Sequence, residues 1–104
     1  MGLFNFGAKK HIADLKELLR ENEKQQAECK EKLDKYESEI NALQTESEKT
    51  TDVKKLEEMS SKIERLLGQM ERMSGIYNEL LTTNLDLETQ LALAEGNLKI
   101  DSKW

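Results

Sequence analysis

The sequence predicts an all-α protein, an antiparallel coiled-coil helical hairpin that dimerises into a four-helix bundle. Two heptad repeats lie on either side of a stretch that has no apolar residue. A seven-residue apolar repeat keeps one seam of a helix facing a partner helix. The composition agrees, because 36% of residues are charged, 5% are aromatic and none is proline. Such a composition is typical of long solvated helices.

The first repeat predicts a helix over residues 9–46. An apolar arm, residues 1–8, precedes it and carries Leu3, Phe4 and Phe6. We expect this arm to pack against the end of the second helix, with insertion into a membrane surface or disorder as the alternatives. The repeat has Ile12, Leu19, Gln26, Leu33 and Ile40 at a, and Leu15, Asn22, Cys29, Tyr36 and Leu43 at d.

A polar gap separates the two repeats. Residues 44–52 contain no apolar side chain and several Ser and Thr residues, which compete with helical hydrogen bonding. Thr51 and Asp52 are candidate N-caps for a new helix. We therefore expect a turn over residues 47–52.

The second repeat predicts a helix over residues 53–99. Gly68 and Gly75 lie inside it, and each costs about 1 kcal/mol of helix stability relative to alanine. The repeat passes both without a change of register, which favours one continuous helix over a break at Ser74–Gly75. It has Leu56, Ile63, Met70, Tyr77, Asn84, Leu91 and Leu98 at a, and Met59, Leu66, Met73, Leu80, Leu87 and Ala94 at d.

A hairpin accounts for both repeats within one structural unit. A single long helix is the alternative, but it would have to absorb the change of register between the repeats. In an antiparallel hairpin an a residue faces a d residue, and a register shifted by one heptad would also close a turn nearby. The pairing that we expect joins Leu43 with Leu56, Ile40 with Met59, Asn22 with Tyr77 and Leu19 with Leu80.

The segment from Ile76 to Ala94 is more apolar than a seam requires. A contiguous apolar face on a helix is seldom left uncovered. We interpret it as the face that closes a homodimer, with a docking groove for a different protein as the alternative. The expected interaction residues are Leu67, Ile76, Tyr77, Leu80, Leu81, Leu85, Leu87 and Leu91.

Three polar residues, Asn22, Gln26 and Asn84, occupy seam positions. A buried asparagine lowers the stability of a coiled coil but specifies its register and oligomeric state. The alternative is that these layers are solvated. Cys29 is also on the seam, where a thiol packs as a small hydrophobe.

Nothing in the chain indicates catalysis, so we expect no enzyme, no cofactor, no metal site and no small-molecule substrate. There is no glycine-rich phosphate loop, no Cys-x-x-Cys pair and no His-Glu-x-x-His motif. A net charge of −5 argues against nucleic acid as a partner. No apolar run would span a membrane, and one cysteine without a recognisable leader suggests a cytoplasmic protein.

The function predicted is that of a non-catalytic coiled-coil interaction protein, acting as an adaptor, assembly factor or inhibitor. Its partners would be a second copy of the chain, giving a dimer or tetramer, and another protein. Two alternatives stay open. One is a peripheral membrane protein held by residues 1–10, and the other is a helical export chaperone.

Overall fold

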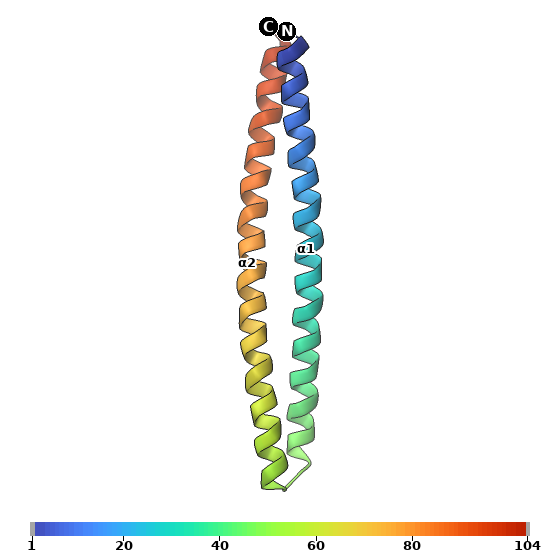
Figure 1. Ribbon diagram of the computed structural model, residues 1–104, viewed down its shortest axis with the longest axis vertical. Coiled ribbons are helices and arrows are strands. Elements are labelled where there is room, and N and C mark those ends of the chain that lie inside the picture. The colour runs from blue at the N-terminus through green and yellow to red at the C-terminus, as the bar shows by residue number, and fades with distance from the viewer. Residues whose placement is uncertain (1, 104) are drawn as a thin grey trace. The chain divides into compact units, whose positions relative to one another are not determined.

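The computed structural model shows a hairpin of two long helices (Figure 1). It describes the backbone of residues 2–103 and the side chains of residues 7–97. Helix α1 is Gly2–Glu48 and helix α2 is Val53–Lys103. The helical hairpin predicted from the two repeats is therefore confirmed. The single long helix is wrong, and so is the three-helix alternative, because α2 continues through Ser74 and Gly75.

Both helices extend past the predicted boundaries. The backbone of α1 is helical from Gly2 rather than from residue 9, and α2 continues to Lys103 rather than to residue 99. Apolar periodicity detects only the part of a helix that has a seam, so the outermost turns leave no such signal. The side chains of Leu3, Phe4 and Phe6 lie outside the described residues, and their predicted packing stays a prediction.

The turn between the helices covers residues 49–52, and Asp52 caps α2. The backbone N–H of Lys54 donates to Asp52 Oδ1 at 3.1 Å. The Asp52 carbonyl accepts the first helical bond, from the N–H of Leu56 at 3.0 Å. The side chain thus satisfies one of the donors that the start of a helix leaves unpaired. Of the two predicted caps, Asp52 is the residue used.

Side-chain hydroxyls accompany the end of α1. Thr45 Oγ1 donates to the Asn41 carbonyl at 2.9 Å, and Ser47 Oγ donates to the Gln44 carbonyl at 2.7 Å. Such bonds draw carbonyls away from the helical ladder and weaken it slightly. Because no apolar side chain anchors this stretch to α2, the helix ends at Glu48.

The chain forms two compact units, each an antiparallel pair of helical segments. Unit 1 comprises Met1–Gln26 and Glu79–Trp104, and unit 2 is Ala27–Asn78. Within the described side chains, every predicted seam position is buried or half-buried. The core residues are Ile12, Leu15 and Leu87 in unit 1, and Cys29 and Ile40 in unit 2. The two heptad repeats are thus the packing seams of both units.

The pairing predicted between the two repeats is wrong by one heptad. In unit 2, Leu43 lines a groove with Lys62 and Leu66, whereas Leu56 lies by Ser47. Leu43 is therefore level with Ile63 instead of Leu56. Both registers place a opposite d, so the repeat cannot distinguish them.

Unit 1 is displaced in the same direction. Lys16 Nζ lies 3.8 Å from Glu95 Oε1. The predicted pairing puts Lys16 level with Thr83, roughly 18 Å along the helix axis from Glu95 at 1.5 Å per residue. Side chains do not span that offset. In the observed register, Leu91 is level with Leu15, not with the N-terminal arm.

Candidate interaction surface

An exposed leucine row lies on the α2 segment of unit 1. It consists of Leu81 and Leu85, one helical turn apart, with Ala92 two turns further along the same face. Leu81 is 37% exposed and Leu85 is 65% exposed. Leu81 is at position e, next to the a/d seam, and Leu85 and Ala92 are at position b, which lies further from the seam on the same side. The row is therefore apolar surface that the hairpin itself does not cover.

The predicted interaction residues divide into two groups. Leu67, Ile76, Leu81 and Leu85 are exposed. The other four face the partner helix within their own unit, with Leu87 buried and Tyr77, Leu80 and Leu91 half-buried. Seam and surface residues were mixed in the prediction because both are apolar and adjacent in sequence. Only the exposed group is available to another molecule.

Acidic side chains accompany the leucine row along α2. Between residues 79 and 97 the charged residues are Glu79, Asp86, Glu88 and Glu95, without one Lys or Arg. Gln90 Nε2 donates to Asp86 Oδ2 at 3.0 Å, which holds that carboxylate along the helix. An exposed ion pair between Lys16 and Glu95 links one of these acids to α1. The row thus has an acidic border, and Glu88 lies within the row itself, about one turn from Leu85 and one turn from Ala92.

Sequence reasoning missed one exposed leucine of α1. Leu18 is exposed and occupies position g of the first repeat, on the opposite flank of the seam from Leu81. The sequence signal that could have identified Leu18 is an apolar residue at position g, next to the charged residues Lys16 and Glu17. Leu93 and Val53 are also exposed, but neither continues the row. Leu93 is at position c of the heptad, and Val53 is the first residue of α2.

A polar cluster interrupts the seam of unit 1. Asn22 is only 5% exposed, and its Oδ1 accepts a hydrogen bond from Gln26 Nε2 on the same helix. On α2, Asn84 Nδ2 donates to Glu88 Oε1 at 3.0 Å. The Oδ1 of Asn84 is buried and has no hydrogen-bond partner within the described side chains. Asn22 is therefore a buried polar residue and not a solvated one.

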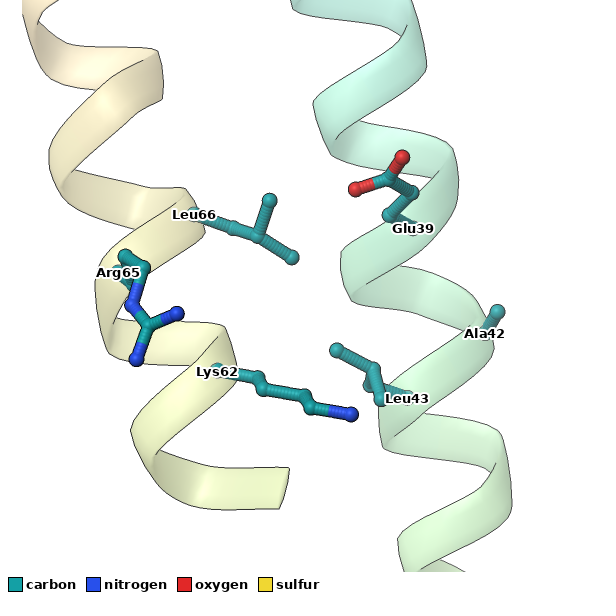
Figure 2. Close-up of a pocket in the computed structure, with 6 residues that line it drawn as sticks. All are labelled: Glu39, Ala42, Leu43, Lys62, Arg65 and Leu66. Carbon is teal, nitrogen blue, oxygen red and sulfur yellow. The ribbon is translucent and has the colours of Figure 1, made fainter. Parts of the chain in front are cut away.

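Unit 2 carries an open groove of about 440 Å³ between its two helical segments. Figure 2 shows Leu43 and Leu66 pointing into the space between α1 and α2, with Lys62 extending across toward Leu43. Glu39, Ala42 and Arg65 complete the lining. The groove marks a place where the seam is loosely filled. Its charged border contains both signs, so it indicates no particular ligand.

The described side chains contain no group of three or more His, Cys, Asp or Glu residues placed to hold a metal ion. Within the described residues, neither helix has a stretch that is long and apolar enough to cross a bilayer. Comparison with known proteins finds no matching family model, no matching curated protein and no matching solved structure.

Proposed function

We propose that this protein is a non-catalytic coiled-coil interaction protein whose first partner is a second copy of itself. The leucine row of Leu81, Leu85 and Ala92 is the contact surface, and two hairpins associate through it into a four-helix bundle. In that assembly the outer helix faces act as an adaptor, assembly or inhibitory surface for another protein. The exposed leucine row is the single observation that carries this proposal.

The area of the chain supports association. Its accessible surface is 8293 Å², whereas a folded monomer of 12.0 kDa exposes about 6,000 Å². The difference, about 2,300 Å², exceeds the roughly 800 Å² that each partner buries in a standard protein interface. Two helices in contact bury one stripe each, so a second hairpin supplies the missing apolar contacts.

The proposal is tested by charging the leucine row. Leu81→Glu with Leu85→Glu places two carboxylates in the proposed interface, where the acidic border of the partner repels them. We expect the unmodified chain to sediment as a dimer or tetramer at micromolar concentration. The double variant should sediment as a monomer, with a dissociation constant raised by about 100-fold or more.

The matched control is Val53→Glu with Leu18→Glu. It also replaces two exposed apolar residues with carboxylates, but away from the row, so its association should be unchanged. A chain that is monomeric before any substitution would overturn self-association. Equal weakening in both double variants would show that net charge, and not the row, governs assembly.

A further inference from the structure

We propose that Asn22 and Asn84 form one hydrogen-bonded layer across unit 1, and that this layer selects the heptad register of the hairpin. The two amides join the existing bonds into a chain that runs from Gln26 through Asn22 and Asn84 to Glu88. Register selection is a property of the folded hairpin itself. The inference therefore does not depend on self-association through the leucine row.

The two asparagines lie at the same level of unit 1. The unit ends at Gln26 on α1 and begins at Glu79 on α2, which puts these two positions side by side in an antiparallel pair. Counting back from Gln26 and Glu79 puts Asn22 level with Thr83, so Asn22 at d shares a layer with Asn84 at a. The same alignment puts Lys16 level with Gln90, which leaves Glu95 within reach of the long Lys16 side chain. In this register the seam therefore gathers its polar residues together.

The hydrogen bonds that the two asparagines already make leave a donor on Asn22 and an acceptor on Asn84. Asn22 accepts a hydrogen bond through Oδ1, so the N–H groups of its Nδ2 can donate to another acceptor. Asn84 donates through Nδ2 to Glu88, while its buried Oδ1 has no partner among the described side chains. A bond from Asn22 Nδ2 to Asn84 Oδ1 satisfies both groups. Each amide in the chain would then donate in one direction and accept from the other.

The layer distinguishes two registers that the apolar residues do not. One heptad away, Asn22 would face Tyr77 and Asn84 would face Leu15. The Asn84 carbonyl oxygen would then be buried against an aliphatic side chain, and an unpaired buried polar group is costly. Leucines, methionines and isoleucines pack acceptably in either alignment. The asparagine layer is thus the feature of the seam that opposes the shift.

The experiment reads the register by intramolecular disulfide trapping in a Cys29→Ala background. One reporter, Leu19→Cys with Leu87→Cys, joins positions that share a layer in the observed register. The other, Leu19→Cys with Leu80→Cys, joins positions that share a layer only after a one-heptad shift. A heptad is about 10 Å of helix, beyond the roughly 7 Å between Cα atoms that a disulfide tolerates. The closed fraction of monomer is measured by mass spectrometry in a glutathione buffer.

With the asparagines present, the 19–87 pair should close about tenfold or more in excess of the 19–80 pair, the preference expected from one unpaired buried amide. Asn22→Leu with Asn84→Leu should bring the ratio close to one. The matched control, Asn41→Leu with Asn97→Leu, makes the same replacements at exposed positions and should keep the original ratio. An unchanged ratio in the layer variant, or an equal fall in the control, overturns the proposal.

Urea unfolding of the same variants gives a second measurement that needs no cysteine. Either single leucine substitution strands the other amide opposite an apolar side chain, whereas the double substitution removes both. The double variant should therefore be more stable than each single variant, giving a clear coupling between the two sites. Additive effects of the two substitutions would mean that the asparagines do not contact each other, and would overturn the layer.

Discussion

Leu15 and Leu18 show how strongly position decides the role of a residue in this protein. Both are leucines of the same α1 segment, less than one helical turn apart. Leu15, at d, is 3% exposed, while Leu18, at g, is 53% exposed. The difference follows from the heptad, since d faces α2 and g only borders the seam.

These two residues allow a matched prediction at the residue scale. Leu15→Ala removes buried apolar contacts and leaves a cavity, so it should lower the free energy of unfolding by about 2–4 kcal/mol. Leu18→Ala makes the same chemical change at the surface and should cost less than about 0.5 kcal/mol. Urea unfolding at low protein concentration measures both values. A large cost at Leu18 would reveal that this leucine is covered by another molecule.

The fate of individual seam residues was mostly predictable. The repeat identified Ile12, Leu15 and Leu87 as seam residues, and each is buried. The surroundings of Asn22 were not predicted correctly. The expected pairing put Tyr77 opposite Asn22, but the hydrogen bond that Asn22 accepts comes from Gln26, one turn along the same helix. That error follows from the register, because the expected partner depends on which residues of α2 are level with Asn22.

At the scale of elements, the continuity of α2 is a balance between glycine and the seam. Gly75 gives the backbone more freedom in the unfolded chain than alanine would. The half-buried Met73 and Tyr77 on either side of it belong to one uninterrupted repeat, and their packing holds the helix straight through this point. Packing of an amphipathic face provides most of the stability of a protein helix.

Gly75→Ala should therefore stabilise α2. A Cβ built at Gly75 meets nothing within 4 Å, and alanine restricts the unfolded chain. We expect the free energy of unfolding to rise by about 0.5–1 kcal/mol, measured by urea unfolding monitored by circular dichroism. Gly75→Val is the control, since a β-branched residue regains less of this helical preference. A loss of stability with alanine would indicate that a partner approaches the backbone closely here.

At the scale of the whole molecule, the central fact is how little of the chain is interior. The described core consists of five apolar residues, Ile12, Leu15, Cys29, Ile40 and Leu87. Small domains that bury little surface have a low free energy of unfolding, and association with another chain commonly raises it. The exposed leucine row is the surface that we propose for such association.

Association predicts that thermal stability depends on protein concentration. If folding is coupled to assembly, mass action raises the Tm as concentration increases. For a chain of this size, each tenfold increase should raise the Tm by roughly 3–5 °C. Thermal unfolding, followed by circular dichroism at protein concentrations from about 1 to about 100 µM, measures the effect. The Leu81→Glu, Leu85→Glu variant should show a Tm that is independent of concentration, and a flat response in the unmodified chain would contradict assembly.

The sequence by itself determined the two helices, the turn between them and the seam that each helix buries. These features depend on local signals, namely a seven-residue apolar period, a polar gap and an Asp at the start of α2. The tertiary structure decided the register between the helices. A heptad repeat looks the same after a shift of seven residues, so apolar periodicity leaves several alignments with similar energy. The choice depends on which particular side chains meet across the seam, and only packed helices show that Asn22 is level with Asn84 and not with Tyr77.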